Sequence, residues 1–218
     1  MKEGRLWKAL SILELVVAAT VIFLDLLVPT LVILMVIVVT FQLRAEGFSD
    51  LGFGKVASPS RMTLVILLLV LAWTIFHLGV SMPVLNRLTG TTQDLSAFDE
   101  LQGDLGNLVL LPLVGWTMAA FGEEIVYRGY LQLRCRDVVG NGRSGIIMAV
   151  AISSLLFGIA HTEQGVVGVT MTTMDAVFFS AIKLGYGDNL WPAVLAHGFS
   201  NIIGLVTFFL VGPVHGRW

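Results

Sequence analysis

Three short clusters of polar residues interrupt apolar sequence in the second half of the chain. A carboxylate beside an imidazole can bind a water molecule and remove its proton. A second imidazole and an amide can donate hydrogen bonds to a developing oxyanion. The residue types therefore indicate hydrolysis by an activated water. The clusters are Glu123-Glu124 with Arg128, Phe157 with His161, and His197 with Asn201.

Spacing within the clusters supports this interpretation. Glu124 lies four residues before Arg128, which is the favourable order for an ion pair on a helix. Glu123 then has no local cation, and a carboxylate in apolar surroundings can act as a base near neutral pH. Each cluster alone also has a structural interpretation: acids at a membrane boundary, an interfacial histidine, or polar contacts between helices. Three such clusters on three separate apolar segments favour a shared site.

Composition places these residues in a membrane protein. Hydrophobic residues make up 56% of the 218 residues and charged residues 13%, which is about half the usual share in a soluble domain. A mean hydropathy of +0.87 excludes a soluble globular protein, and disorder requires the opposite composition. The net charge of −2 gives no general attraction to nucleic acid, so no nucleic-acid partner is expected. The single cysteine, Cys135, excludes an intrachain disulfide.

Seven apolar stretches approach the length of roughly 20 residues that a helix needs to cross a bilayer. The sequence predicts an all-α, polytopic transmembrane helix bundle with about seven spans, within limits of six to eight. Residues 1–105 would hold the N-terminal helices and an outer loop, and residues 106–218 a catalytic helical core, all in one membrane domain. The first two stretches would form a tight hairpin that turns near Asp25–Pro29. The stretches are 9–24, 26–43, 62–86, 107–122, 144–160, 164–182 and 189–216.

The distribution of basic residues sets the expected orientation through the positive-inside rule. With the N-terminus in the cytoplasm, 11 of the 13 basic residues fall in inner segments, and only Arg87 and Arg217 fall outside. The N-terminal inner segment includes Lys2, and the outer loop 88–106 is acidic. We therefore expect a cytoplasmic N-terminus, a C-terminus outside, and a lipid bilayer around the chain.

The order and spacing of the three clusters match EExxxR, FxxxH and HxxxN. Over roughly residues 106–211, the sequence resembles the CPBP (Abi) family of CaaX-processing and bacteriocin-processing intramembrane proteases, which includes the Rce1-type CaaX endopeptidases. This resemblance implies that Glu123 is the general base and that His161 helps to bind the attacking water. It implies that His197 and Asn201 form an oxyanion hole. Supporting roles fall to Glu124, Arg128 and Phe157.

Two interpretations of metal dependence remain open. Glu123, His161 and His197 could supply three zinc ligands and leave a fourth position for water, and family members are often described as metalloproteases. The chain has no HExxH helix, however, and the Rce1-type members are better described as metal-free glutamate proteases. We favour a metal-free site and keep zinc as the alternative cofactor.

Helix lengths test whether the clusters can meet at one depth. Asn141 lies in the turn expected between the spans 107–122 and 144–160. Glu123 lies 18 residues before Asn141, and His161 lies 20 residues after it. At 1.5 Å per residue, both would lie about 27–30 Å from that turn. His197, 10 residues past Gly187, would lie only about 15 Å from its own turn. The arithmetic leaves a mismatch of roughly 10 Å unresolved.

Some ionisable residues lie in predicted spans but outside the motifs. Asp175 could line a wet cavity, touch substrate or contact a neighbouring helix, whereas His77 is interpreted as structural. Glu14 and Asp25, eleven residues apart, would share a face if one helix continued between them. That pair would line a cavity or, as we favour, anchor the chain at the membrane interface.

The leading hypothesis is an intramembrane endopeptidase that hydrolyses a peptide bond of a membrane-associated peptide or protein. The alternative is a non-proteolytic scaffold or immunity protein of the same family that binds a peptide or partner. A transporter with a proton-coupled acid is a third hypothesis, but the sequence lacks the internal repeat that many transporters show. A prenylated tail, a bacteriocin leader, a signalling peptide and a membrane-protein loop would each fit as the substrate.

Overall fold

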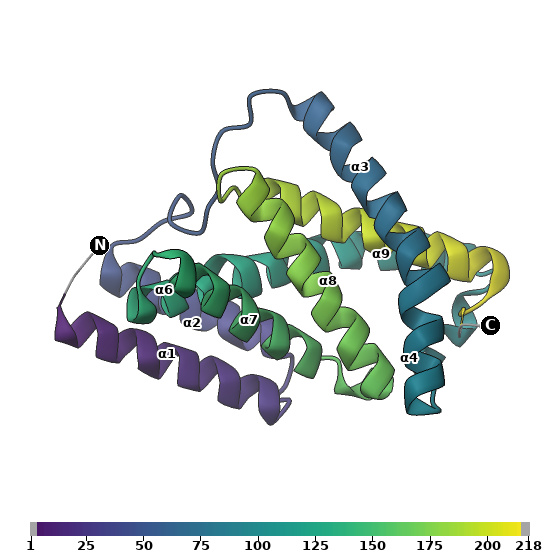
Figure 1. The fold of residues 1–218 in the computed structure, drawn as a ribbon, viewed down its shortest axis with the longest axis horizontal. Helices are drawn as coiled ribbons and strands as arrows, with labels where there is room; N and C mark the ends of the chain where they lie inside the picture. Colours follow the sequence, from purple (N-terminus) through teal and green to yellow (C-terminus); the bar gives the residue numbers. More distant parts are fainter. Residues whose placement is uncertain (1–3, 215–218) are drawn as a thin grey trace.

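The computed structural model describes residues 4–214, and within that range the chain is helical, with no β-strand (Figure 1). Five helical stretches are long and apolar enough to cross a membrane. Two shorter apolar helices accompany them, and together the seven coincide with the seven predicted spans. The all-α polytopic bundle is confirmed. The five long stretches are Arg5–Phe23, Pro59–Thr89, Leu105–Val139, Thr162–Gly185 and Trp191–Val211, and the two shorter helices are Pro29–Arg44 and Arg143–Ile159.

The described α-helices follow one another along the chain with short π- and 3₁₀-helical segments between some of them. The α-helices are α1 (Arg5–Phe23), α2 (Pro29–Arg44), α3 (Pro59–Phe76), α4 (Met82–Thr89), α5 (Leu105–Val114), α6 (Gln132–Val139), α7 (Arg143–Ile159), α8 (Gly165–Gly185) and α9 (Trp191–Val211). The π-helical segments are η1 (His77–Ser81) and η3 (Gly115–Leu131). The 3₁₀ segments are η2 (Ser96–Leu101) and η4 (Thr162–Gln164).

The first two helices form the predicted hairpin. Helix α2 begins at Pro29, whose fixed φ and missing N–H suit the first position of a helix. Asp25 and Leu27 adopt left-handed backbone angles, with φ of 46° and 58°, so α1 cannot continue through them. Glu14 and Asp25 therefore do not share a helix face. The two acids do not form a pair, because Glu14 is buried among other helices while Asp25 is exposed, and anchoring at the membrane interface stays a prediction.

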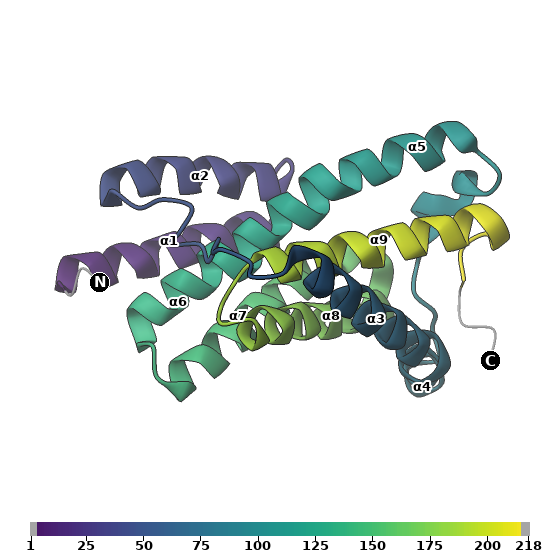
Figure 2. The ribbon, with the colours of Figure 1, turned by 90° about the horizontal axis from the view of Figure 1, so that it is seen from above.

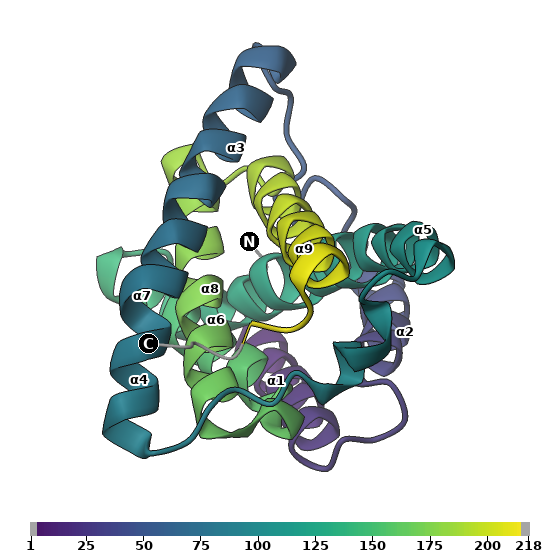
Figure 3. The ribbon, with the colours of Figure 1, turned by 90° about the vertical axis from the view of Figure 1, so that its right-hand side faces the viewer.

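One long rod of α5, η3 and α6 runs through the molecule (Figure 2). Helix α9 packs along η3, α7 packs against α6, and the α1–α2 hairpin packs against α6 and η3. Helix α8 contacts both α7 and α9. Figure 3 shows α3 and α4 as a second rod on the other side of the molecule, where α3 contacts α9 and α4 contacts α8. The elements that carry the three motifs are thus direct neighbours.

Both π-helical segments adjoin a proline. Pro112 lies inside α5 just before η3, and Pro83 lies two residues after the end of η1. Proline has no backbone N–H, so the carbonyl four residues earlier loses its usual partner and the hydrogen-bond pattern changes locally. Segments with the π pattern are rare and frequently occur at functional sites. The two glutamates of the first motif lie in η3, and His77 lies in η1.

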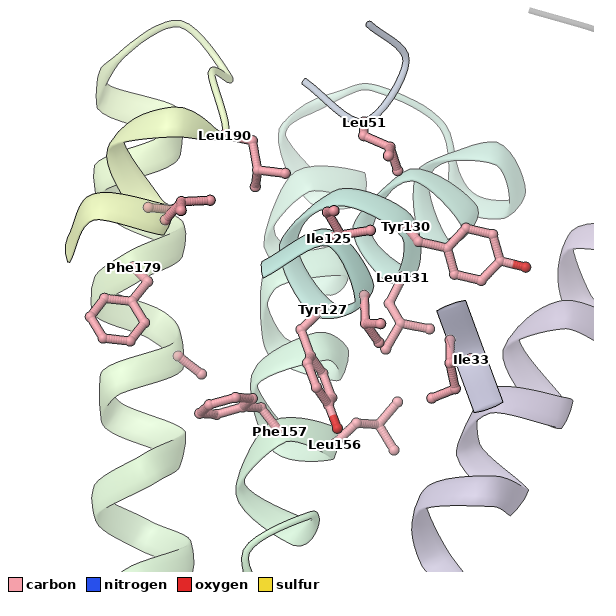
Figure 4. Close-up of a cluster of buried hydrophobic side chains, with 14 of the residues drawn as sticks. Ile33, Leu51, Ile125, Tyr127, Tyr130, Leu131, Leu156, Phe157, Phe179 and Leu190 are labelled. Atoms are coloured by element: carbon pink, nitrogen blue, oxygen red, sulfur yellow. The ribbon is translucent and has the colours of Figure 1, made fainter. Parts of the chain in front are cut away.

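A buried apolar cluster holds η3 against α7 and α8, and Figure 4 shows Tyr127, Phe157 and Phe179 within it. The rod also has a charged junction with the hairpin. Glu14 Oε1 accepts a hydrogen bond from Arg44 Nε at 3.0 Å, and its Oε2 forms an ion pair with Arg134 Nε at 2.7 Å. These contacts join the N-terminal helices to the motif-bearing half of the chain.

Two expectations about organisation stay predictions. The division of the chain at residue 105 is one, and the cytoplasmic N-terminus with an outer C-terminus is the other. Lys2 and Arg217, which entered the charge count, lie outside the described residues.

Candidate active site

A cavity of about 460 Å³ lies where η1, η3, α7, α8 and α9 meet. Four residues predicted as catalytic line it together, although they come from three separate apolar stretches of sequence. The cavity wall is otherwise mostly apolar, which is typical of a small-molecule or peptide site with few polar groups. The four lining residues are Glu123, His161, His197 and Asn201.

The two adjacent glutamates occupy different surroundings. Glu124 is fully buried, and its Oε1 lies 2.9 Å from Arg128 Nη1 in an i,i+4 ion pair. Glu123 faces the cavity with 20% of its side chain exposed, and its Oε2 lies 3.9 Å from His197 Nε2. The predicted pairing of Glu124 with Arg128 is present. Glu123 is left as the carboxylate that solvent or substrate can reach.

His161 is held by the backbone of its own helix. Its Nδ1 lies 2.8 Å from the carbonyl oxygen of Phe157, one turn earlier. A carbonyl oxygen only accepts hydrogen bonds, so Nδ1 carries the proton and donates. In the neutral imidazole, Nε2 therefore carries the lone pair and can accept a hydrogen bond from a water. His161 lines the same cavity as Glu123, at the point where α7 ends.

His197 is oriented by the second glutamate. Its Nδ1 donates to Glu124 Oε1 at 2.9 Å, which fixes the ring and directs Nε2 to the side of Glu123. Asn201 lies one turn further along α9 and lines the cavity with it. A hydrogen-bonded carboxylate is a common way to fix the tautomer and orientation of a functional imidazole. Glu124 thus connects Arg128 to His197.

Two phenylalanines pack around these charged groups. The Arg128 guanidinium lies 4.3 Å from the ring centre of Phe157 and 5.3 Å from that of Phe179. The ring of Phe157 also lies 4.7 Å from that of His161, and Phe179 stacks on His197 at 5.1 Å. Aromatic faces attract cations and exclude water, so both rings help to keep this charge network in place. Phe179 belongs to none of the three motifs, and the sequence analysis missed it.

Two glycines allow the helices to approach closely enough to assemble the site. A Cβ at Gly198 would lie 2.5 Å from the ring of Trp116, so α9 packs directly against η3. A Cβ at Gly158 would lie 1.9 Å from Thr173 Oγ1, so α7 packs equally closely against α8. Distances below about 3 Å are not tolerated by real side chains. Both contacts therefore require glycine.

The π-helical form of η3 shortens the distance between Glu123 and the turn, but by much less than the mismatch of roughly 10 Å in the sequence arithmetic. That arithmetic assumed 1.5 Å per residue between Glu123 and the turn at Asn141. Eight or more of those residues, through Leu131, are π-helical, and a π-helix places more residues in each turn. Glu123 consequently lies less far from the turn than an α-helix would place it. Glu123 and His197 nevertheless lie at the same level, with Glu123 Oε2 3.9 Å from His197 Nε2.

Three residues outside the motifs also line the cavity wall: Trp73, His77 and Asp175. His77, which was interpreted as structural from the sequence, forms part of this wall. Asp175 lines the cavity, which was one of the three alternatives predicted for it. Asp175 also contacts a neighbouring helix, because its Oδ1 accepts a hydrogen bond from Trp73 Nε1 at 2.7 Å. The only sequence signal for His77 and Asp175 was an ionisable group inside an apolar stretch, and Trp73 had none.

The fit of the site to a metal ion can be judged from its donor atoms. Within residues 4–214, no group of three His, Cys, Asp or Glu side chains is arranged to hold a metal ion. Nδ1 of each imidazole is engaged, by a carbonyl in His161 and by Glu124 in His197, which leaves Nε2 of both rings free to bind a water or another group. The side chains as placed do not fit a zinc site, so the chemistry below is derived from the protein groups.

Comparison with known proteins identifies a family for this part of the chain. Residues 105–203 match the family model described as "Type II CAAX prenyl endopeptidase Rce1-like", a segment that contains all three motifs. Searches of curated proteins and of solved structures found no match. The long apolar helices and this match together make the chain an integral membrane protein. The match of residues 105–203 to the Rce1-like family model confirms the resemblance that the three motifs predicted.

Proposed function

We propose that this protein is an intramembrane endopeptidase that cleaves a membrane-associated peptide with a water activated by Glu123 and His161. The observation that carries the proposal is the cavity itself. Side chains of Glu123, His161, His197 and Asn201 from three different helical segments line one space. Family membership supports a protease at the coarse level. The catalytic groups and the reaction steps are our inference.

The first step is attack on the peptide carbonyl. Water donates one hydrogen bond to His161 Nε2 and transfers its other proton to the Glu123 carboxylate as its oxygen bonds to the carbonyl carbon. The carbonyl oxygen becomes an oxyanion. His197, protonated on both nitrogens, donates to Glu124 through Nδ1 and to the oxyanion through Nε2, and the Asn201 amide donates a second hydrogen bond.

The second step is collapse of the tetrahedral intermediate. The C–N bond breaks, and Glu123 returns its proton to the leaving amine, which regenerates the carboxylate. Glu124 and Arg128 do not touch the substrate in this scheme. They hold His197 in register, because Glu124 contacts both Arg128 and His197 at 2.9 Å.

Glu123→Gln tests the proposal most simply. It keeps the shape of the side chain and removes the base, so peptide cleavage by the detergent-purified protein should fall by about 10²–10⁴-fold. His161→Ala should also abolish cleavage. Glu100→Gln, an exposed acid in the loop before α5, serves as the matched control. Wild-type rates in Glu123→Gln would contradict the proposal, and a phenotype that survives this change would indicate a non-proteolytic scaffold. A parallel assay with a chelator tests metal dependence.

A further inference from the structure

A second polar cluster lies in the cavity wall, formed by Asp175 on α8 with Trp73 and His77 on the α3–η1 rod. Asp175 Oδ1 accepts a hydrogen bond from Trp73 Nε1 at 2.7 Å. His77 Nε2 lies 3.7 Å from the same oxygen, which is beyond hydrogen-bond distance. The three residues line the cavity that also contains Glu123, so the proposed catalytic groups and this cluster face one space.

Two hydrogen-bonding positions of this cluster have no partner among the described residues. His77 is 8% exposed, and its Nε2 is buried without a hydrogen bond. No hydrogen bond reaches Asp175 Oδ2, although 28% of the side chain remains exposed within a helix that is apolar enough to span a membrane. A buried polar atom without a partner is destabilising, because it has lost its hydrogen bonds to water. Both positions are therefore suited to a group that arrives from outside the protein.

The charges that line the cavity indicate the sign of that group. The described residues of the wall include two carboxylates, Glu123 and Asp175, and no lysine or arginine. Glu123 has the imidazole of His197 at 3.9 Å, whereas the hydrogen-bond donor to Asp175 is the neutral indole of Trp73. A carboxylate inside a membrane span is costly unless a partner compensates it. A cation would supply that compensation.

We infer that Asp175 and His77 form a subsite that binds a basic group of the substrate while the peptide bond lies at Glu123. An ammonium or guanidinium group carries several N–H donors, so it can donate to Asp175 Oδ2 and, when His77 is neutral with its proton on Nδ1, to His77 Nε2 as well. Trp73 is a positioning residue that holds Asp175 through its indole N–H. The inference rests on the proposed function, because the bound peptide is a substrate only if the protein cleaves it, but binding can be measured without cleavage.

The test measures binding to protein that carries Glu123→Gln, so that turnover does not interfere. The probes are three leucine-rich peptides of about 20 residues, the length that spans a bilayer. Two are acetylated at the N-terminus, one with a central lysine and one with a central norleucine. The third has a central norleucine and a free amino terminus. The lysine peptide should bind at least about tenfold more tightly than acetylated norleucine, as expected for a charged hydrogen bond. Tighter binding of the free-amine peptide alone would identify the amino terminus as the basic group.

Asp175→Asn is the decisive variant because the amide can still accept from Trp73 while losing its charge. The ratio of lysine to norleucine affinity should fall close to one in Asp175→Asn and stay unchanged in Asp25→Asn, which removes an exposed acid from the α1–α2 turn. Equal affinities for all three peptides in the starting protein would overturn the inference even if Asp175→Asn failed to fold. A ratio that persists in Asp175→Asn would also overturn it. If the wild-type protein cleaves no peptide, the proposed function is contradicted, but the ratios of lysine to norleucine affinity can still be interpreted.

Discussion

At the scale of single residues, two adjacent glutamates are expected to respond differently to the same substitution. Glu124→Gln removes a charge that is fully buried beside Arg128, and breaking a buried ion pair from one side costs on the order of 3 kcal/mol. Glu123 has no ionic partner closer than 3.9 Å, so Glu123→Gln should leave stability almost unchanged while cleavage is lost. Thermal unfolding and peptide cleavage of the two variants check this contrast. Equal destabilisation by both would show that their roles are not divided in this way.

Residue spacing predicted the Glu124–Arg128 pair because i,i+4 contacts need only local geometry. It did not predict the hydrogen bond from His197 to Glu124, which joins residues 73 positions apart. For the same reason, Phe179 was missed and His77 was interpreted as structural. Their contacts with the site arise from the crossing of α8, α9 and the α3–η1 rod, and no local pattern records such a crossing.

At the scale of helices, the contact between α9 and η3 should tolerate no side chain at Gly198. Gly198→Ala places a methyl group 2.5 Å from the outer ring of Trp116 and should cost about 1–3 kcal/mol of stability. It should also lower cleavage by moving His197 away from Glu124. Trp116→Phe removes the ring atoms in the way and should recover stability in the double variant.

Gly204→Ala is the control for stability, because no atom lies within 4 Å of a Cβ at that position of α9. Its unfolding temperature should match or exceed that of the wild type. If Gly198→Ala unfolds at the wild-type temperature, the close packing of the two helices is not a requirement of the fold.

The turn between α8 and α9 should be sensitive to acid. Burial alone would raise the pKa of Asp188, but ion pairs with Lys183 and Arg136, each at 2.6 Å, hold it below its usual value. A lowered pKa means that this stabilisation is complete above the unfolded-state pKa and is lost as the pH falls through the folded-state pKa. Asp188→Asn should therefore reduce the loss of stability on acidification. Unfolding temperatures measured from neutral to acidic pH should converge for the two proteins, and parallel curves would contradict this.

The element boundaries show where sequence analysis was sufficient. The hairpin turn near Asp25–Pro29 and all seven apolar helices followed from hydropathy and from proline, which are properties of the local sequence. The relative depth of Glu123 and His197 did not, because it depends on how the helices cross as well as on the 17-residue π-helix, and apolar periodicity indicates neither. Pro112 lies three residues before the π-helix begins, but a single proline does not indicate how long such a segment is.

At the scale of the whole molecule, the N-terminal hairpin lies outside the matched family segment but is joined to it by Glu14. Glu14→Ala removes the carboxylate shared by Arg44 and Arg134 and should lower stability by on the order of 3 kcal/mol. Limited proteolysis between α2 and α3 should become faster at the same time. Asp25→Asn is the matched control, since its acid is exposed. Unchanged unfolding of Glu14→Ala would mean that apolar packing alone holds the hairpin.

The central claim is that Glu123 activates a water molecule for peptide hydrolysis inside the helix bundle. Mass spectrometry of the products of cleavage in H₂¹⁸O by the purified protein tests it most directly. The account predicts one ¹⁸O atom in the new carboxyl group with the wild type, and at least about 10²-fold less of this product with Glu123→Gln. Labelled product at the wild-type rate from Glu123→Gln would contradict it.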